Sequence, residues 1–170
     1  MRKVKLYITA SLDGFIAPPD GDMDWLVGYP LPSKEDHENF TDSVDTVIIG
    51  GRVYHDMQCM DILWPYKDKT VYVVARNPRM EREEVKFITE NIVETVTQLK
   101  KESGKDIWLV SGGWLTSLLN DNGLIDEIII TKIPETLEKG IQLPINLEDW
   151  ILKEDISYDN AATKKVYQSA

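Results

Sequence analysis

The chain has 170 residues, of which 42% are hydrophobic, and a formal net charge of −10. This composition is typical of one folded domain and excludes a disordered chain, while the acidic balance argues against nucleic acid as a main partner. The single cysteine, Cys59, excludes an intrachain disulfide, and with only two histidines in the chain we expect no metal site.

Targeting and membrane signals are absent from the sequence. No apolar run approaches the roughly 20 residues that a membrane-spanning helix needs, and residues 1–5 lead directly into a strand without the apolar core of a signal peptide. We therefore expect a cytoplasmic protein without membrane contacts. The acidic charge does not exclude an anionic ligand, because a local pocket can be positive in an acidic protein.

Hydrophobic periodicity predicts strands and helices that alternate along most of the chain. Strands are expected at residues 4–9, 15–17, 45–49, 70–75, 85–88, 107–110 and 125–133, and helices at 34–42, 52–60, 92–102 and 114–120. Ser33 and Gly104 are the expected caps of the first and third of these helices. Two further strands, 150–157 and 163–169, add an antiparallel edge. The fold class is therefore α/β, with a mostly parallel sheet and helices on both faces.

Two of these strands end in a pair of glycines that leads into a helix. The strand at 45–49 runs into Gly50-Gly51, and the strand at 107–110 runs into Ser111-Gly112-Gly113. Glycine lets the backbone approach a ligand closely, and the unpaired N–H groups of a helix N-terminus suit a phosphate. A third strand ends in Arg76, a guanidinium at the same edge of the sheet. We expect both corners to bind one extended anion.

Several familiar catalytic motifs are missing. The sequence has no Gly-x-x-x-x-Gly-Lys-Ser/Thr, Gly-x-Gly-x-x-Gly or Gly-x-Ser-x-Gly pattern, which disfavours a nucleotide hydrolase, a standard dinucleotide fold and a serine hydrolase. The remaining class is a redox protein in which a phosphate-bearing cofactor carries out the difficult chemical step. Asp13 is either a turn aspartate or a substrate-orienting carboxylate, and Trp25 either anchors a loop or, with Asp24, covers a flat heterocycle. No histidine looks well placed, so we expect any proton to come from water.

Several segments together resemble the dihydrofolate reductase fold. They resemble more closely the reductase domain of bifunctional riboflavin-biosynthesis proteins and its stand-alone relatives. The matching segments are 7–17, 21–26, 45–50, 73–77, 107–115 and 123–127. Because the resemblance covers nearly the whole chain, it implies a single dihydrofolate reductase-like domain over residues 1–170. The resemblance to this family also implies a homodimer.

The resemblance implies NADPH as cofactor and assigns roles to individual residues. The two corners would bracket the pyrophosphate, Arg76 would meet the ribose 2′-phosphate, and the Gly112–Gly113 peptide bond would be cis. The implied cofactor-binding residues are Thr9, Ala10, Ile16, Gly50, Gly51, Arg52, Val53, Ala75, Arg76, Ser111, Gly112, Gly113, Trp114 and Leu115. The implied substrate-binding residues are Asp24, Trp25 and Thr131, with Ser11 and Asp13 as the catalytic pair that orients the substrate.

The chain departs from the family pattern at two places. The family's second corner usually reads Gly-Arg-x-Thr/Ser-Tyr, whereas residues 50–54 place the arginine one position later, at Arg52, and put Val53 where the hydroxyl belongs. Losing a hydrogen bond to a charged group costs about 1.5–3 kcal/mol. Glu138 stands where relatives usually have glycine, and we expect its carboxylate to crowd an anionic substrate.

The best function on these grounds is NADPH-dependent hydride transfer to a small heterocyclic substrate. The nearest activity is reduction of 5-amino-6-(5-phosphoribosylamino)uracil in riboflavin biosynthesis. Pterin reduction is one alternative and needs a carboxylate on helix 34–42, for which Glu35, Asp36 and Glu38 are the candidates. The other alternative is a non-catalytic nucleotide-binding protein, which the altered second corner favours.

Overall fold

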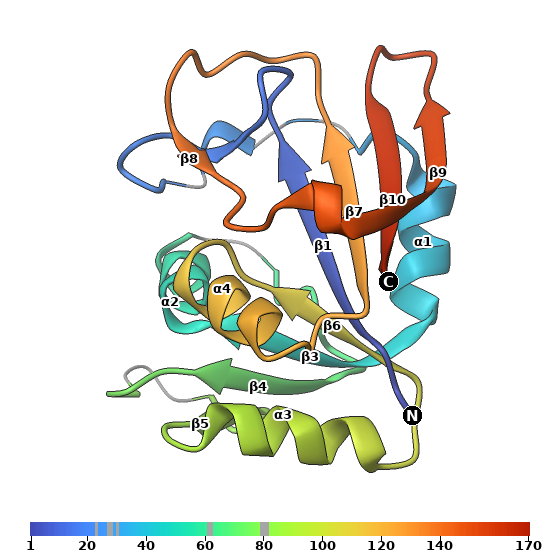
Figure 1. Cartoon of the computed structure of the whole chain (residues 1–170). Coiled ribbons are helices and arrows are strands. Elements are labelled where there is room, and N and C mark those ends of the chain that lie inside the picture. Colours follow the sequence, from blue (N-terminus) through green and yellow to red (C-terminus); the bar gives the residue numbers. More distant parts are fainter. Residues whose placement is uncertain (23, 27–28, 30, 61–62, 79–81) are drawn as a thin grey trace.

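The computed structural model describes residues 1–22, 24–26, 29, 31–60, 63–78 and 82–170. Its main sheet contains β1 (Val4–Ala10), β3 (Val44–Gly50), β4 (Thr70–Val74), β5 (Val85–Ile88), β6 (Asp106–Val110), β7 (Glu127–Lys132), β9 (Trp150–Ser157) and β10 (Thr163–Ser169). The strand order is β5-β4-β3-β6-β1-β7-β10-β9 (Figure 1). Neighbours from β5 to β7 are parallel, and β10 is antiparallel to both β7 and β9. The expected parallel sheet with an antiparallel C-terminal edge is confirmed.

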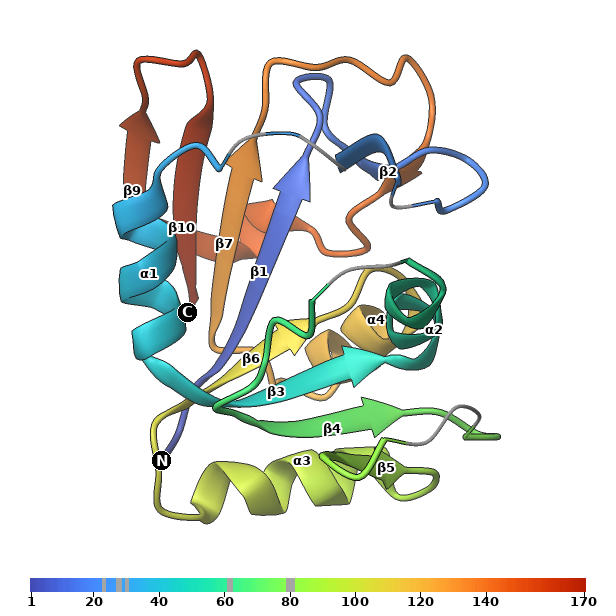
Figure 2. The same ribbon diagram turned by 180° about the vertical axis from the view of Figure 1, so that it is seen from behind.

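In the described part of the chain, four α-helices cover the sheet on both faces, as expected. They are α1 (Lys34–Asp42), α2 (Gly51–Cys59), α3 (Ile92–Lys101) and α4 (Trp114–Asp121). Figures 1 and 2 show α3 and α4 on one face and α1 and α2 on the other. The alternation of β3 explains this arrangement, because successive side chains point to opposite faces. Ile48 packs in the cluster that contains Leu119 of α4, whereas Val47 and Ile49 pack with Tyr54 of α2.

The helix ends follow the sequence signals in one case and depart from them in another. Ser33 caps α1 by accepting a hydrogen bond from the Asp36 amide at 3.2 Å, as expected. The expectation that Gly104 caps α3 is wrong, because the Glu102 N–H closes the helix on the Leu99 carbonyl. Gly104 lies beyond that turn with φ +150, where a Cβ would come within 2.7 Å of the Asp45 carboxylate. The glycine therefore provides room rather than a helix cap.

A small second sheet stands opposite the ends of β3 and β6. It pairs β2 (Phe15–Ala17) with β8 (Ile141–Gln142), a strand too short to be predicted from periodicity. A Cβ at Gly140 would lie 2.2 Å from the Ala17 carbonyl oxygen, so only glycine permits this close approach. The described residues also form two short 3-10 helices, η1 (Asp24–Leu26) and η2 (Leu147–Asp149).

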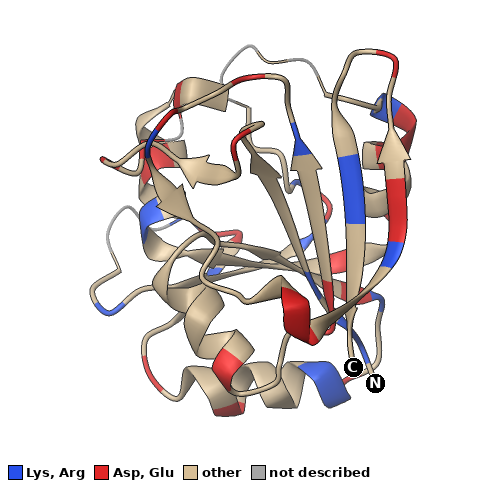
Figure 3. Ribbon diagram, turned by 45° about the horizontal axis from the view of Figure 1, so that its top comes forward, with Lys and Arg blue, Asp and Glu red and all other residues tan. Residues whose placement is uncertain are grey.

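Acidic and basic residues are interspersed along the described chain. Figure 3 shows acidic and basic residues spread over the helices, the loops and the C-terminal strands, without a continuous basic stripe in this view. No helix in the described part of the chain has the length and apolar character to cross a membrane.

Candidate active site

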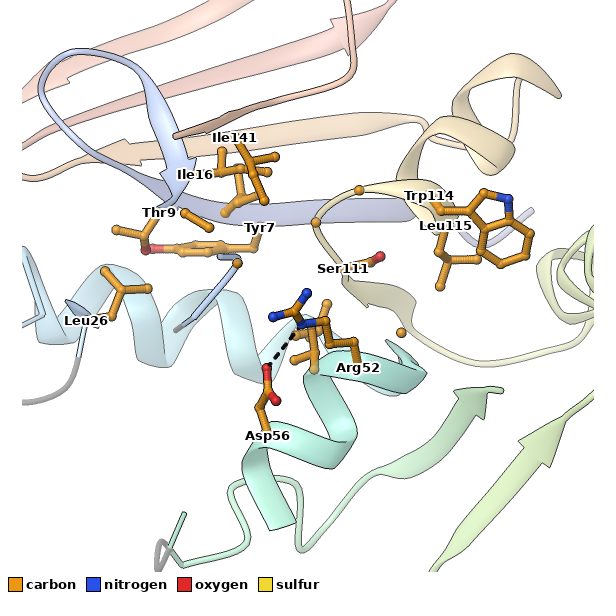
Figure 4. Close-up of a pocket in the computed structure, with 18 of the residues that line it drawn as sticks. Tyr7, Thr9, Ile16, Leu26, Arg52, Asp56, Ser111, Trp114, Leu115 and Ile141 are labelled. Atoms are coloured by element: carbon orange, nitrogen blue, oxygen red, sulfur yellow. Dashed lines mark ion pairs between the residues drawn. The ribbon is translucent and has the colours of Figure 1, made fainter. Parts of the chain in front are cut away.

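The main pocket opens where β1, β3 and β6 end, between these strands and the small β2–β8 sheet. Its volume is about 530 Å³, within the range of small-molecule sites. The walls come from β1, β2, α1, the two glycine corners and β8. Figure 4 shows Trp114 and Leu115 at one end, Tyr7 and Leu26 at the other, and Arg52 between them. We call the first the glycine end and the second the aromatic end.

Both glycine corners lie side by side in this pocket. Because β3 and β6 are neighbours with Ile49 paired to Val110, Gly50 and Ser111 follow at the same level, and a Cβ on Gly50 would be 3.2 Å from the Ser111 hydroxyl oxygen. Neither α2 nor α4 has a side-chain cap. The N–H groups of their first turns therefore lack a side-chain acceptor and can bind an anion.

The glycines of the two corners serve different purposes. A Cβ on Gly51 would lie 2.9 Å from the Val74 carbonyl oxygen, so Gly51 lets α2 begin directly against the end of β4. A Cβ on Gly113 would meet nothing within 4 Å, so its absence leaves open space in the pocket. The glycine end therefore has the close backbone approach and the free room that a pyrophosphate needs.

The expected cis bond at Gly112–Gly113 is wrong. No cis peptide bond occurs among the described residues, and Gly113 precedes α4 with φ −82 and ψ −98. A trans bond is the low-energy form for any residue that does not precede proline, and here it already places the start of α4 at the pocket.

Arg52 carries positive charge into the middle of the pocket. Its Nη2 donates to the Asp20 carbonyl at 2.5 Å, and its Nε lies 3.9 Å from Asp56. The guanidinium fits under the loop because Gly21 has no side chain there. The Arg52 side chain remains 66% exposed and is therefore accessible to a ligand, although it lies one position later than in the family pattern.

A second hollow of about 410 Å³ meets the main pocket at Gly51. It is lined by Ala75, Arg76 and Asn77 from the end of β4, and by residues of α2 and Phe87. The Arg76 guanidinium carbon lies 6.0 Å from the centre of the Trp114 ring, within reach of a cation–π contact. The structure thus brings together two residues that the sequence placed at the cofactor on separate grounds.

Three rings from distant segments form the aromatic end. Tyr7 of β1, His37 of α1 and Trp108 of β6 all line the pocket. The His37 ring centre is 6.1 Å from Tyr7 and 6.2 Å from Trp108, with edge-to-face geometry in both cases. His37 Nδ1 and Trp108 Nε1 are buried without a hydrogen-bond partner among the described residues. His37 thus lines the pocket, although the sequence had not placed a histidine there, and the expectation that a proton comes from water stays a prediction.

Burial also sets the charge of His37. Desolvation lowers its pKa below 6.5, and the nearby Glu38 carboxylate opposes the shift only in part. The imidazole is therefore mainly neutral near pH 7. In that form one ring nitrogen donates a hydrogen bond and the other accepts one.

The carboxylates of α1 do not face the pocket. Asp36 accepts hydrogen bonds from the Tyr158 hydroxyl and from Lys164 Nζ, and these contacts lower the pKa of its carboxyl group. Glu38 lies 3.6 Å from Lys34 on the surface, and Glu35 is exposed. The carboxylate that pterin reduction needs is thus missing from the described pocket lining.

Residues 2–140 match the model of the RibD C-terminal domain family. The chain belongs to that family. This RibD-type domain is also 40% identical over 143 residues to the uncharacterized protein YwjB of Bacillus subtilis (strain 168), which covers 84% of the chain and 82% of YwjB. A second Bacillus subtilis protein, the uncharacterized protein YyaP, is 31% identical over 161 residues, covering 88% of the chain and 84% of YyaP.

Solved structures establish the fold of the RibD-type domain as dihydrofolate reductase-like. A protein of Shewanella sp. PV-4 that is assigned to riboflavin biosynthesis superimposes with a TM-score of 0.81 at 23% identity, over 99% of both chains. An Enterococcus faecalis dihydrofolate reductase complexed with NADP(H) gives a TM-score of 0.67 at 18% identity, over 98% of this chain and 95% of that one. The family is one of NADPH-dependent reductases.

The RibD resemblance also assigned Ser11 and Asp13, and here the contacts point to a structural role. The Ser11 hydroxyl donates to Asp13 at 2.6 Å, and the Asp13 carboxylate accepts the amides of Leu137 and Glu138 at 3.1 and 2.7 Å. The Ser11 bond lowers the pKa of Asp13 most. Neither residue is among those that line the pocket. The geometry supports the turn aspartate, and the catalytic role stays a prediction that no contact supports.

Glu138 departs from the RibD pattern for a backbone reason. Its φ is +63, a left-handed conformation that glycine adopts without cost, which explains the glycine in relatives. Glu138 is exposed and does not line the described pocket. The expected crowding of a substrate by its carboxylate therefore stays a prediction that no contact in the pocket supports.

The other predicted residues fall into two groups. Thr9, Ile16, Val53, Ser111 and Leu115 line the main pocket, as do the two glycine corners. Ala10, Asp24, Trp25 and Thr131 do not. In η1, Leu26 lines the pocket instead of Asp24 or Trp25. Thr131 is 2% exposed, and its Oγ1 lies 3.4 Å from the Tyr7 hydroxyl oxygen. The substrate-binding role of Thr131 therefore stays a prediction that no contact with the pocket supports.

Proposed function

We propose that the protein is an NADPH-dependent reductase that transfers hydride to a small heterocyclic substrate. The observation that carries the proposal is the pair of uncapped helix N-termini, at adjacent strand ends, that open into one pocket next to Arg52. One such terminus is a common anion site. Two in register, with a second arginine across the Gly51 boundary, suit an extended cofactor with several phosphates.

The residues present fit such a cofactor. The amides of the two corners would hold the pyrophosphate, Arg52 would add a charged contact, and Arg76 would select the 2′-phosphate. Thr9 and Ile16 would lie against the nicotinamide. When bound, NADPH supplies the hydride.

The protein's own contribution is mainly positioning. The pocket would hold the two ring systems between β1 and the β2–β8 wall, from which Ile16 and Ile141 line it. Fixing two reactants at contact distance removes the entropic cost of their encounter. We propose that the proton comes from water. Asp13 is not the proposed donor, because its carboxylate oxygens already accept hydrogen bonds from the Ser11 hydroxyl and the Glu138 amide.

Within this proposal, the nearest activity is reduction of 5-amino-6-(5-phosphoribosylamino)uracil. It is favoured by kinship with the RibD C-terminal domain, and a Thermotoga maritima protein of similar fold is named for that reductase activity. Pterin reduction is disfavoured, because Asp36 is bound to Tyr158 and Lys164 instead of facing the pocket.

The proposal is tested by NADPH oxidation with a panel of heterocycles that includes 5-amino-6-(5-phosphoribosylamino)uracil and dihydrofolate. We expect turnover with NADPH and little turnover with NADH. Because the reaction does not require Asp36, the Asp36→Asn variant should keep the wild-type turnover. Tight NADPH binding without turnover of any heterocycle would favour a non-catalytic nucleotide-binding protein. Loss of turnover in a folded Asp36→Asn variant would restore the pterin alternative.

A further inference from the structure

Two loops meet beside the small β2–β8 sheet, the turn between β1 and β2 and the loop between β7 and β8. They lie side by side in Figures 1 and 2, and hydrogen bonds join them. The Leu12 amide donates to the Glu135 carbonyl at 2.7 Å. The Asp13 carboxylate accepts the amides of Leu137 and Glu138, at 3.1 and 2.7 Å. We call these contacts the Asp13 clasp.

The Asp13 carboxylate is itself held in place by Ser11, which is fully buried. The Ser11 hydroxyl donates to Asp13 Oδ1 at 2.6 Å and accepts the Phe15 amide at 2.9 Å. The bond from Ser11 is the largest cause that lowers the pKa of Asp13 below 3.8. Near neutral pH the group is therefore an ionised acceptor, suited to hold two amides and without a proton to give.

The loop that the clasp holds depends on contacts with distant residues. Its strand, β8, has only two residues and pairs with the three residues of β2, and a pair of strands this short is marginally stable by itself. Glu138 has a φ of +63, a left-handed conformation that is costly for a residue with a side chain and persists only where its surroundings hold it. The Asp13 carboxylate supplies such a contact at the Glu138 amide.

The same loop carries one wall of the pocket. Ile141 of β8 lines the pocket and lies next to Ile16 of β2 (Figure 4). The chain reaches this wall through Gly140, whose backbone passes so close to β2 that a Cβ would lie 2.2 Å from the Ala17 carbonyl oxygen. Because only two residues separate Glu138 from Ile141, a displacement of the clasped amides would displace the wall.

We infer that Asp13 is a positioning residue, which holds the β8 wall at the pocket through the backbone amides of Leu137 and Glu138 and does not touch the ligand. The inference rests on the proposed function, which places the nicotinamide at Ile16, next to Ile141. It gives the Ser11–Asp13 pair a role other than catalysis. Removal of the carboxylate lowers the fraction of molecules whose wall is in place, and the affinity for a ligand at the wall falls with that fraction.

Hydrogen exchange on the whole chain tests whether the clasp holds the loop. We expect Asp13→Ala to speed exchange of the amides in residues 137–142 at least about fivefold and to leave β3 and β6 unchanged, as in a local opening. Glu138→Gly is the matched control, because it removes the neighbouring carboxylate and keeps the N–H of the clasp, and its loop should stay as protected as in wild type. Unchanged exchange in Asp13→Ala would overturn the inference, and so would faster exchange throughout the main sheet, which indicates a general loss of stability.

NADPH titration tests whether the wall matters to the ligand. Asp13→Ala should weaken NADPH binding about three- to tenfold, and Asp13→Asn, which keeps one acceptor oxygen, should weaken it less. In an Ile141→Ala background, Asp13→Ala should change the affinity less than about twofold, because the contact through which Asp13 acts is already gone. The same loss in both backgrounds would mean that Asp13 acts on the ligand independently of this wall, and it would overturn the inference.

Failure of the proposed function has a different signature from failure of this inference. If wild type does not bind NADPH at millimolar concentration, the reductase proposal fails, whereas the hydrogen-exchange comparison still decides whether Asp13 holds the β8 wall. If wild type and a folded Asp13→Ala variant bind NADPH equally, the positioning role is refuted and the reductase proposal stands.

Discussion

One end of the pocket is built from backbone and the other from side-chain rings. At the glycine end, the contacts available to a ligand are backbone amides at the starts of α2 and α4. Side-chain substitutions change such contacts little, provided that Gly51 and Gly113 stay small. At the aromatic end they are Tyr7, His37 and Trp108, three side chains from separate elements. The first end suits a cofactor shared by a family, and the second suits a substrate that differs among members.

The largest effect is expected from closing the glycine end. Gly51→Val would push branched carbon atoms against the Val74 carbonyl, which already lies 2.9 Å from a Cβ position. We expect NADPH affinity to fall at least about a hundredfold, since displacement of the helix end removes two or more charge-assisted hydrogen bonds. The unfolding free energy should drop by about 1–3 kcal/mol. Fluorescence titration and urea denaturation measure the two effects.

Gly112→Ala is the matched control for this change. Its Cβ would make an ordinary contact, 3.7 Å from Ile16 Cδ1, so the unfolding free energy should stay within about 0.5 kcal/mol of wild type. Wild-type NADPH affinity in Gly51→Val would show that the cofactor does not use this end.

The next effect concerns cofactor choice at the second hollow. Arg76→Gln should weaken NADPH binding about tenfold or more and leave NADH binding unchanged, because it removes one charged contact to the 2′-phosphate. Arg82→Gln is a suitable control, since Arg82 lies 4.7 Å from the Trp64 ring centre instead of at the hollow. An equal loss for both cofactors would place Arg76 at some other part of the ligand.

A smaller gain is expected from restoring the family's hydroxyl at the second corner. Val53→Thr should tighten NADPH binding by about two- to tenfold, the effect of one hydrogen bond of roughly 0.5–1.5 kcal/mol. Val53 already lines the pocket, so the hydroxyl needs no backbone movement to reach it. Val53→Ala, which adds no polar group, should show no gain, and equal affinities for Thr and Ala would mean that the missing hydroxyl is not a phosphate contact.

The smallest effect tests the aromatic end through pH. Burial lowers the pKa of His37 below its unfolded value of 6.5, so the folded protein takes up a proton less readily than the unfolded chain. The unfolding free energy is then at its full value above about pH 6.5, and decreases as the pH falls from there through the folded pKa. His37→Phe should remove this part of the slope in urea denaturation, whereas His55→Gln should keep it.

The elements that follow local rules were predictable from the sequence. The glycine corners were visible because each strand, glycine pair and helix are consecutive, and β9 (Trp150–Ser157) and β10 (Thr163–Ser169) have the expected bounds. The aromatic end was missed because it depends on how α1 is rotated against the sheet. That rotation turns His37 and Phe40, three positions apart, toward the interior. It also places Asp36 where it accepts a hydrogen bond from Lys164 of β10.

Two other misses have backbone causes. β8 (Ile141–Gln142) has only two residues, too few for a periodic pattern, although Gly140 marks its close approach to β2. The left-handed conformation of Glu138 cannot be read from a residue type that seldom adopts it. Contacts with distant residues hold both segments: β8 pairs with β2, and the Glu138 N–H donates to the Asp13 carboxylate.

The most direct test of the central claim is titration of the protein with NADPH, followed by tryptophan fluorescence, with NADH in parallel. Trp114 is 57% exposed at the glycine end, and Trp108 lines the aromatic end, so both can report a bound nicotinamide nucleotide. We predict saturable quenching with a micromolar dissociation constant for NADPH and clearly weaker binding of NADH. Absence of binding at millimolar NADPH would contradict the account, because the two helix N-termini would then not form a cofactor site.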